Sequence, residues 1–392
     1  MKHLRVLALA ALLMTIALAG CLNTDSSPAG TVDEAPGAEN VEEPTQNPDM
    51  PEAPPEEPPI LEVPTATNVT RFIAVGDTGT GKEAQYAVAA AMEQVCAERG
   101  CDFILSLGDN IYESGVKDPY DPQFISKFED PYANLTQPWY LVLGNHDNSM
   151  DPLTGGPCGD PCDTGFGHWY EAGNHEVAYS YRTDRESDKW HLPARYYGLV
   201  ANNVSLFGID SSTLMFYGLG FPPTDYTYQQ QESWMESAIA AADTPWKIAF
   251  AHHPYVSNGQ HGNAGQYECN NTEYVPTNLC GFDYYAPALS GQYVKEFYEE
   301  HLCGKVDFIM TGHDHDLQWL APVESCGGTE FIVSGAGAKQ RDLSDETRNE
   351  AFFQEGEVYG FFWFELRQET FTGMAYSETG EMLYERTVAK PL

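Results

Sequence analysis

The sequence is poor in basic residues. It holds 20 Lys and Arg against 58 Asp and Glu, which gives its 392 residues a formal net charge of −38. Such a chain repels polyanions, so we expect neither nucleic acid binding nor non-specific adhesion to anionic lipid. Long apolar runs are also scarce, and beyond residue 20 no stretch is long and apolar enough to cross a membrane. Hydrophobic residues nevertheless make up 42% of the chain, which excludes a wholly disordered or fibrous protein.

Residues 1–20 have the pattern of an export signal. Two basic residues precede an almost wholly apolar stretch over residues 6–19, which is too short to span a bilayer. The stretch ends in small residues just before Cys21. This order predicts a lipoprotein signal that is cleaved before Cys21, with lipid attached to the sulfur of that residue; an ordinary signal peptide or an uncleaved anchor is the alternative. We therefore expect an exported protein that is either held as a lipoprotein on the extracytoplasmic face of the cell membrane or secreted.

The next segment, residues 21–67, differs in composition from the rest of the chain. Between residues 22 and 67 there are ten Pro and eleven Asp and Glu, but no Lys or Arg. Proline favours extended conformers and like charges repel, so the composition predicts a disordered tether. Residues 68–392 remain for one folded domain.

Cysteine usage agrees with export. Nine cysteines are present, and eight remain once Cys21 is set aside. An even number in an exported chain predicts disulfides. Pairing of nearest neighbours is the hypothesis that we adopt, and it gives Cys96–Cys101, Cys158–Cys162, Cys269–Cys280 and Cys303–Cys326. Half a zinc site at Cys158 and Cys162 is the alternative, but no matching cysteine pair or His couple follows.

From residue 68 on, the hydrophobic pattern predicts an α/β domain. Short apolar runs predict strands over residues 71–75, 102–107, 139–143, 246–250 and 306–310. Apolar residues three and four apart predict a helix over residues 82–99, and further helices are predicted over residues 229–242 and 293–302. The alternation indicates βαβ units and a mostly parallel sheet. Beyond residue 330, predicted strands follow one another directly, over residues 331–334, 359–366, 371–376 and 382–387.

Five polar clusters follow directly on predicted strands. They are Gly76-Asp77-Thr78-Gly79, Gly108-Asp109-Asn110-Ile111-Tyr112, Gly144-Asn145-His146-Asp147, Ala251-His252-His253-Pro254 and Gly312-His313-Asp314-His315. In an open α/β sheet, ligands bind at the carboxyl ends of the strands. Glycine before a polar residue permits a tight turn and a close approach of the backbone. We therefore expect these five loops to converge on one place.

The side chains of these clusters suit a pair of metal ions. Carboxylate and amide oxygens suit hard cations, and imidazole suits zinc, iron and similar metals. The two oxygens of Asp109 allow it to bridge two cations, and a phenolate ligand such as Tyr112 favours a trivalent metal. Taken singly, Gly-Asp after a strand is usually a helix cap or a turn, and a lone His is usually structural. Five such clusters in order, each at a strand end, argue against that interpretation for the set.

The clusters resemble the motifs of the binuclear metallophosphoesterases, and within them those of the purple acid phosphatases of the small, tartrate-resistant type. The match extends beyond the ligands, over most of residues 70–340. It includes the run from Gly108 to Val116, Pro138-Trp139-Tyr140 before the third cluster, and Ser334-Gly335-Ala336-Gly337. The resemblance implies that residues 68–392 form the catalytic domain, an α/β calcineurin-like metallophosphoesterase sandwich of two mixed β-sheets flanked by helices.

Carried over position by position, the resemblance implies two metal sites. The first would be formed by Asp77, Asp109, Tyr112 and His315, and would hold Fe(III). The second would be formed by Asp109, Asn145, His252 and His313, and would hold Fe(II), Zn(II) or Mn(II). His253 competes with His252 for its place, and the alignment of the motif favours His252. Tyr112 also implies the charge-transfer colour of a tyrosinate bound to Fe(III).

The implied chemistry is hydrolysis of phosphate monoesters by an acid phosphatase. A metal-bound hydroxide would be the nucleophile. His146 would give a proton to the leaving group, and His261 would share in substrate orientation and proton transfer. A small phosphorylated substrate is the expected partner, membrane contact is expected only through the lipid at Cys21, and we expect a monomer.

Two other functions stay open at this point. A phosphodiesterase or nucleotide pyrophosphatase could use the same scaffold. A non-catalytic surface binding protein could have retained the scaffold in inert form, although every expected ligand is present with its side-chain type intact.

Overall fold

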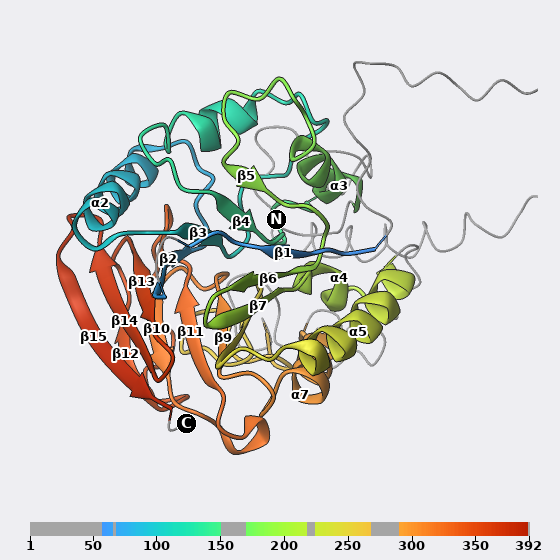
Figure 1. Ribbon diagram of the computed structural model, residues 1–392, viewed down its shortest axis with the longest axis vertical. Helices are drawn as coiled ribbons and strands as arrows, with labels where there is room; N and C mark the ends of the chain where they lie inside the picture. Colours follow the sequence, from blue (N-terminus) through green and yellow to red (C-terminus); the bar gives the residue numbers. More distant parts are fainter. Residues whose placement is uncertain (1–56, 66–67, 150–169, 218–223, 268–289, 391–392) are drawn as a thin grey trace, which may run out of the picture. The chain divides into compact units, whose positions relative to one another are not determined.

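Two mixed β-sheets carry the fold in the computed structural model, which describes residues 57–65, 68–149, 170–217, 224–267 and 290–390 (Figure 1). The eight-stranded sheet holds, in spatial order, β1 (Ile60–Glu62), β6 (Tyr197–Ala201), β7 (Val204–Gly208), β8 (Trp246–Phe250), β9 (Phe308–Thr311), β11 (Glu330–Ser334), β10 (Leu317–Leu320) and β12 (Ala351–Glu355). The seven-stranded sheet holds β15 (Met382–Ala389), β14 (Thr370–Ser377), β13 (Gly360–Leu366), β2 (Thr70–Val75), β3 (Phe103–Ser106), β4 (Trp139–Leu141) and β5 (Trp190–His191).

Parallel strands form the centre of each sheet. In the seven-stranded sheet, β2, β3, β4 and β5 run parallel, whereas β13, β14 and β15 add antiparallel strands on the other side of β2. In the eight-stranded sheet, β7, β8, β9 and β11 run parallel. Parallel strands direct their carboxyl ends to one edge. The predicted sandwich of two mixed sheets is therefore confirmed.

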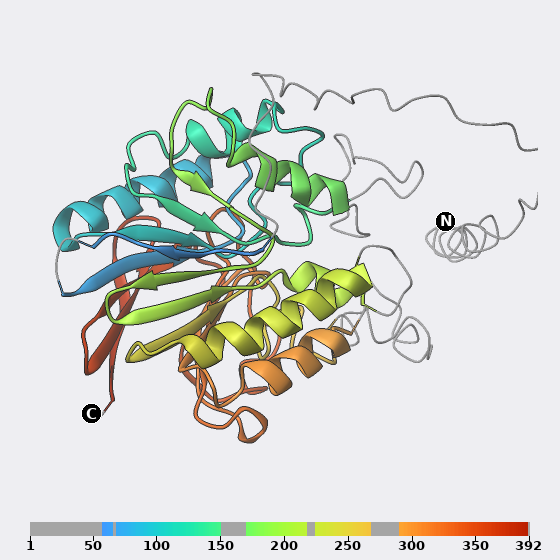
Figure 2. The ribbon, with the colours of Figure 1, turned by 45° about the vertical axis from the view of Figure 1, so that its right-hand side comes forward.

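Helices cover the outer faces. The helix α2 (Glu83–Arg99) packs against β13 and β14 of the seven-stranded sheet. On the eight-stranded sheet, α5 (Thr224–Ala241) and α7 (Gln292–His301) lie side by side, and α4 (Ser211–Met215) contacts both (Figure 2). The remaining helical pieces are α3 (Tyr170–Tyr179), a π-helical turn η1 (Ile125–Glu129) and a 3-10 turn η3 (Glu324–Cys326).

Two apolar cores stabilise these layers. The larger one lies between the sheets, where Trp319 meets Phe364 and Phe371, and Phe308 stacks on Phe371 with ring centroids 4.0 Å apart. The smaller one lies under α5 and α7 and contains Phe297 and other buried residues of the helices and strands around it. Burial of each large apolar side chain contributes about 1.5–3 kcal/mol, so these cores hold the strand ends in fixed places.

Each strand and helix predicted from residue 68 on is present in the described structure, but several other elements were not predicted. The hairpin of β6 and β7 was not predicted; its two-residue turn contains Asn202, whose backbone has a φ of 46°. The boundary predicted at residue 67 is wrong, because β1 pairs in parallel with β6 and Val63 is buried. Residues 21–67 as a whole are rich in proline and acidic residues, and for this reason the short strand β1 was not predicted. Residues 1–56, including Cys21 and the predicted signal, lie outside the described residues.

Two of the predicted disulfides are confirmed. Cys96 pairs with Cys101 at the end of α2, and Cys303 pairs with Cys326. The pairs predicted at residues 158 and 162 and at residues 269 and 280 lie outside the described residues. Disulfides persist in oxidising compartments, so the two observed bonds fit an exported protein.

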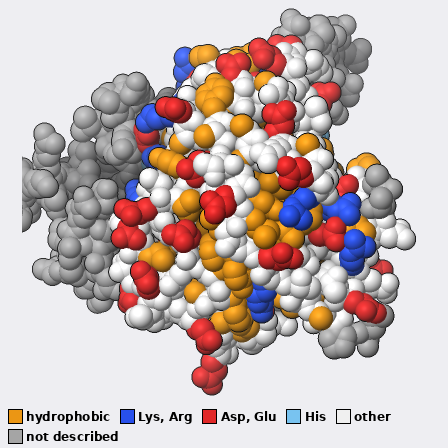
Figure 3. Space-filling model, turned by 90° about the vertical axis from the view of Figure 1, so that its left-hand side faces the viewer, with side chains coloured by type: hydrophobic (Ala, Val, Ile, Leu, Met, Phe, Trp, Pro, Cys, Tyr) orange, Lys and Arg blue, Asp and Glu red, His pale blue; other side chains and the backbone are white. Residues whose placement is uncertain are grey.

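The described surface shows where the acidic excess lies. On the face near β15, acidic side chains are scattered over the surface and few basic ones accompany them (Figure 3). The excess charge is therefore spread over this face and not gathered into one patch.

Among the helices of the described ranges, none combines the length and the apolar character that a membrane crossing needs.

Candidate metal centre

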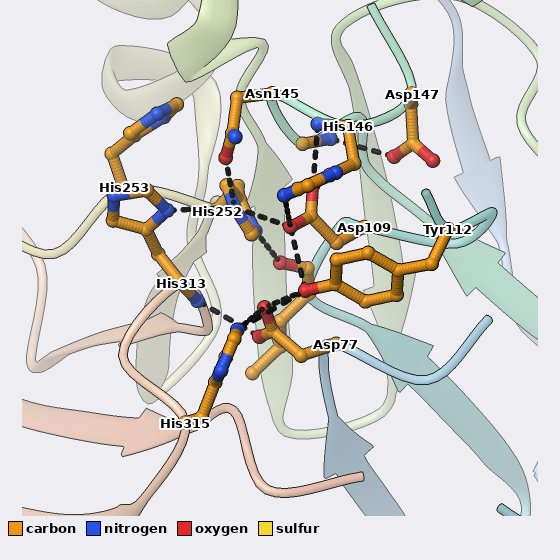
Figure 4. Close-up of polar contacts among 12 residues, drawn as sticks. Asp77, Asp109, Tyr112, Asn145, His146, Asp147, His252, His253, His313 and His315 are labelled. Carbon is orange, nitrogen blue, oxygen red and sulfur yellow. Dashed lines mark hydrogen bonds and ion pairs between the residues drawn. The ribbon is translucent and has the colours of Figure 1, made fainter. Parts of the chain in front are cut away.

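Five loops meet where strands of both sheets end (Figure 4). Asp77 follows β2, Asp109 follows β3 and Asn145 follows β4, all in the seven-stranded sheet. His252 follows β8, and the loop that begins with His313 follows β9, both in the eight-stranded sheet. The structure thus brings together all five clusters that the sequence placed at strand ends.

The backbone of this region is unusual at three predicted ligands. Asp77, Asp109 and His313 adopt left-handed conformations, with φ of 59°, 52° and 72°. Non-glycine residues rarely adopt this conformation, and each instance costs about 1–3 kcal/mol. Such strain persists only where the surrounding structure enforces it, and it clusters at functional sites.

Glycines let the loops approach each other closely. A Cβ atom added to Gly108 would lie 2.7 Å from Nδ1 of His252. A Cβ atom added to Gly144 would lie 2.1 Å from Oδ1 of Asp109. Any side chain at either position would therefore push two predicted ligand loops apart.

Tyr112 lies at the centre of the first predicted site. Its hydroxyl donates to Oδ1 of Asp77 at 2.7 Å and lies 2.8 Å from Oδ2 of Asp109. Nε2 of His315 lies 3.2 Å from the same hydroxyl and 3.3 Å from Oδ1 of Asp77. Four predicted ligands of one metal thus direct their donor atoms at each other.

Asp109 also belongs to the second predicted site. Nε2 of His252 lies 3.4 Å from Oδ2 of Asp109, 2.9 Å from Oδ1 of Asn145 and 3.1 Å from Nδ1 of His313. The backbone amide of His313 donates to Oδ2 of Asp77 at 2.8 Å and so joins the two predicted metal sites. Asp109 lies between these two sites, where a carboxylate shared by both would have to lie.

The geometry separates His252 from His253. Nδ1 of His252 lies 2.9 Å from the carbonyl oxygen of Leu107, which can only accept, so Nε2 is left to face Asp109 and Asn145. Nδ1 of His253 instead lies 2.9 Å from the hydroxyl of Ser211. Donor atoms of His252, His253 and His313 nevertheless lie within 4.8 Å of one another. The contacts favour His252 as the ligand and place His253 behind it.

The electrostatics of the centre fit bound cations. Burial and the facing carboxylates of Asp109 and Asp77 hold the pKa of Tyr112 well above its usual value. Burial acts to raise the pKa of Asp109, but His252 and His146 outweigh it, and the pKa lies well below the usual value. A buried group of two carboxylates and a phenol, all facing one another, is a natural place for positive charge.

Two imidazoles of the centre are harder to protonate than a free histidine. Burial, with the neighbouring His261 and His253, lowers the pKa of His313 well below its usual value. Burial also lowers the pKa of His315, although Asp77 acts in the opposite direction. Metal ions bind the neutral imidazole, so the structure keeps these ligands in their binding form. The donor set of carboxylates, phenol, amide and imidazoles fits two transition metal ions.

The two predicted catalytic histidines occupy different environments. Nδ1 of His146 lies 2.7 Å from the carbonyl oxygen of Glu113, and its Nε2 lies 4.0 Å from Oδ2 of Asp109. The ring of His261 stacks on that of His313, with centroids 3.9 Å apart and an interplanar angle of 30°. Nε2 of His261 lies 3.1 Å from Nη1 of Arg341. Both rings therefore border the predicted metal ligands.

A buried acidic pair behind the centre was not predicted. Asp147 accepts from the backbone amides of Gly144 and Ile111 at 2.7 and 3.0 Å, so it ties the second cluster to the third. The side-chain amide of Asn110 donates to both Asp147 and Glu176. Burial raises the pKa of Asp147 to about 7, and burial with the nearby Asp147 raises that of Glu176 well above its usual value.

Asp314 positions the loop of His261. Its Oδ1 accepts from the backbone amide of His261 at 2.8 Å, and its Oδ2 accepts from the hydroxyl of Ser257. Asp147 and Asp314 lie inside the sequence clusters, so their motifs were a signal for them. Nothing in the sequence pointed to Glu176 or Arg341.

With this geometry, the chain can be compared with known proteins. Residues 70–317 match the family of calcineurin-like phosphoesterases, a span that covers more than half of the sequence and all predicted metal ligands. The chain therefore belongs to this family.

Its relatives are purple and tartrate-resistant acid phosphatases. Tartrate-resistant acid phosphatase type 5 of Homo sapiens is 27% identical over 349 residues, covering 82% of this chain and 91% of the relative. Purple acid phosphatase 4 of Arabidopsis thaliana is 27% identical over 352 residues, covering 85% and 87%. The predicted resemblance is confirmed, and family and relatives together support hydrolysis of phosphoesters at a two-metal site.

Solved structures confirm the fold. GAP50 of Plasmodium, described as the anchor in the inner membrane complex, has a TM-score of 0.60 at 18% identity and covers 83% of this chain and 90% of its own. The purple acid phosphatase PPD1 of yellow lupin has a TM-score of 0.53 at 15% identity, covering 82% of this chain and 54% of its own. At these identities the likeness concerns the fold alone.

Proposed function

We propose that this protein is an exported acid phosphatase that hydrolyses phosphate monoesters at a centre of Fe(III) and a divalent metal ion. The position of Tyr112 carries the proposal. Its hydroxyl lies within 2.8 Å of both Asp77 and Asp109 and 3.2 Å from His315, so a trivalent cation would find a phenolate and two carboxylates together.

The residues that would hold the two ions are those predicted from the sequence. Asp77, Asp109, Tyr112 and His315 would hold Fe(III), and Asp109, Asn145, His252 and His313 would hold Fe(II), Zn(II) or Mn(II). When bound, the ions attract the phosphoryl oxygens, activate the attacking water and offset the charge of the transition state.

His146 supplies the proton for the leaving group. A carbonyl oxygen can only accept, so the contact with Glu113 fixes the hydrogen of His146 on Nδ1. The proton that moves must then be carried by Nε2, the atom that faces Asp109. The ring of Tyr112, 4.4 Å away between centroids, limits the rotation of the imidazole. This arrangement presents an acid of fixed orientation to the departing oxygen.

His261 orients the substrate. A guanidinium only donates, so Nε2 of His261 accepts from Arg341 and its hydrogen is on Nδ1. Stacking on His313 keeps the ring parallel to a metal ligand. The contact with Arg341 therefore fixes the orientation of the His261 ring at the border of the centre, and His146 is the better placed of the two for proton transfer.

Purified protein tests the proposal directly. Metal analysis should give two ions per chain with iron among them, and the protein should show a visible absorption band that Tyr112→Phe abolishes. It should hydrolyse p-nitrophenyl phosphate faster than bis(p-nitrophenyl) phosphate. The reverse preference would identify a phosphodiesterase. A chain with neither metal nor turnover would support the alternative of a surface binding protein.

We further propose that the enzyme is a monomer tethered to the extracytoplasmic face of the membrane by lipid on Cys21. The acidic, proline-rich segment after Cys21 and the two observed disulfides support export. Cys21→Ser should release the protein from the membrane fraction. Mass spectrometry of the N-terminal peptide can verify the lipid on Cys21.

A further inference from the structure

Arg341 lies beside the candidate metal centre and is partly exposed. Its backbone amide donates to the carbonyl oxygen of His315 at 2.8 Å. Its Nη1 donates to Nε2 of His261 at 3.1 Å, and His261 stacks on His313. Arg341 is thus anchored between the loop of His261 and the loop that carries both His313 and His315.

Most donors of this guanidinium have no partner in the part of the chain that the structure describes. Within the described ranges, the bond to His261 is its one hydrogen bond, and no carboxylate forms an ion pair with it. The basic residues around it are engaged: Lys339 pairs with Glu113 at 2.8 Å, and Nη1 of Arg348 donates to the carbonyl oxygens of Ser257 and Gly259 at 2.7 and 2.8 Å. Arg341 therefore differs from its neighbours in having donors left for a ligand.

The charge of Arg341 matters because of its surroundings. The chain carries a formal net charge of −38, which opposes the approach of an anionic substrate. A guanidinium presents several N–H donors in one plane, which match the oxygens of a phosphate or a carboxylate. Two metal ions already suffice to hold the phosphate that is cleaved. The donors of Arg341 that have no partner among the described residues would then be available to a second anionic group.

We infer that Arg341 binds a second oxyanion, a phosphate or a carboxylate, on a substrate whose first phosphate lies at the metal centre. The preferred substrates are then phosphate esters or anhydrides with two anionic groups. This inference rests on the proposed function and deepens it, because it names the substrate class of the same centre.

Three substrates test the inference in the metal-loaded, full-length enzyme. They are p-nitrophenyl phosphate, with no second anionic group, inorganic pyrophosphate, with a second phosphate, and 3-phosphoglycerate, with a carboxylate. Arg341→Gln should lower kcat/KM for pyrophosphate or 3-phosphoglycerate at least tenfold more than for p-nitrophenyl phosphate, chiefly through KM, as expected for the loss of a charge-assisted hydrogen bond of about 1.5–3 kcal/mol. Arg341→Lys, which keeps the charge, should restore part of the preference. Whichever of the two substrates is affected more identifies the second group.

A binding measurement removes the dependence on turnover. Calorimetry should show that Arg341→Gln weakens binding of methylenediphosphonate, which is not hydrolysed, about tenfold more than binding of inorganic phosphate. The control is Arg367→Gln, which removes the same charge from a residue that pairs with Glu365 away from the centre. Equal losses for all ligands would show that Arg341 only positions His261, and would overturn the inference. A wild-type enzyme that turns over none of the substrates would instead overturn the proposed function.

Discussion

His146 is oriented by Glu113, whose carbonyl oxygen lies 2.7 Å from Nδ1 of the imidazole. The side chain of the same glutamate accepts from Nζ of Lys339 at 2.8 Å. Lys339 lies in the loop after β11, so this contact joins that loop to the loop after β3. Two residues outside the predicted ligand set, Glu113 and Lys339, thus fix the direction of the proposed acid.

The first prediction concerns the proton that His146 delivers. His146→Ala should lower kcat by about 10²–10⁴-fold while metal content stays at two ions per chain. His146→Asn, which can still donate to Glu113 but has no Nε2, should lose as much. Because a poor leaving group needs the proton most, the loss should be larger for an alkyl phosphate than for p-nitrophenyl phosphate. Equal losses for the two esters would exclude His146 as the acid.

A second prediction concerns the field around Tyr112. Nζ of Lys339 lies 3.7 Å from the centroid of the Tyr112 ring, where its positive charge stabilises a phenolate. In Lys339→Met the phenolate should rise in energy, so the proposed visible band should move to longer wavelength. Absorption spectra of the two proteins measure the shift, and Lys305→Met, which removes a lysine at the end of α7, is the control. An unmoved band would show that the ammonium does not act on the tyrosinate.

The sequence was sufficient to predict those ligands of the centre whose positions depend on a local sequence pattern. Asp77, Asp109 and Asn145 each follow an apolar run and a glycine, and parallel strands bring such ends together. Contacts between distant segments were not predictable. Asp147 meets Glu176 through Asn110, and Arg341 meets His261 across 80 residues, because the packing of whole loops determines both. The left-handed backbone of His313 likewise depends on its surroundings and not on its residue type.

A third prediction uses the buried pair of Asp147 and Glu176. Burial and Asp147 raise the pKa of Glu176 well above 4.5, so the folded protein keeps a proton there that the unfolded chain releases. The unfolded state then binds fewer protons above pH 4.5, and stability falls as the pH rises toward the folded pKa.

Glu176→Gln imitates the protonated acid and should remove this loss. The variant should be more stable than the wild type at pH 8, on the order of 1–3 kcal/mol, and no more stable at pH 4. Urea unfolding at the two pH values measures the difference. A gain of the same size at both would mean that better packing, and not the proton, causes the effect.

The last prediction concerns the space between the second and third clusters. In Gly144→Ala the new Cβ would lie 2.1 Å from Oδ1 of Asp109 and 2.4 Å from its backbone nitrogen. These contacts are too short to be relieved unless Asp109 moves, and Asp109 is the carboxylate proposed to bridge both ions. The variant should therefore lose metal from both sites together and activity with it, while the sandwich, held by cores elsewhere, still unfolds cooperatively. Gly328→Ala is the matched control, because its Cβ would meet nothing within 4 Å and should leave metal content unchanged. If Gly144→Ala lost only one ion, Asp109 would not be shared between them, since displacing a common ligand must weaken both.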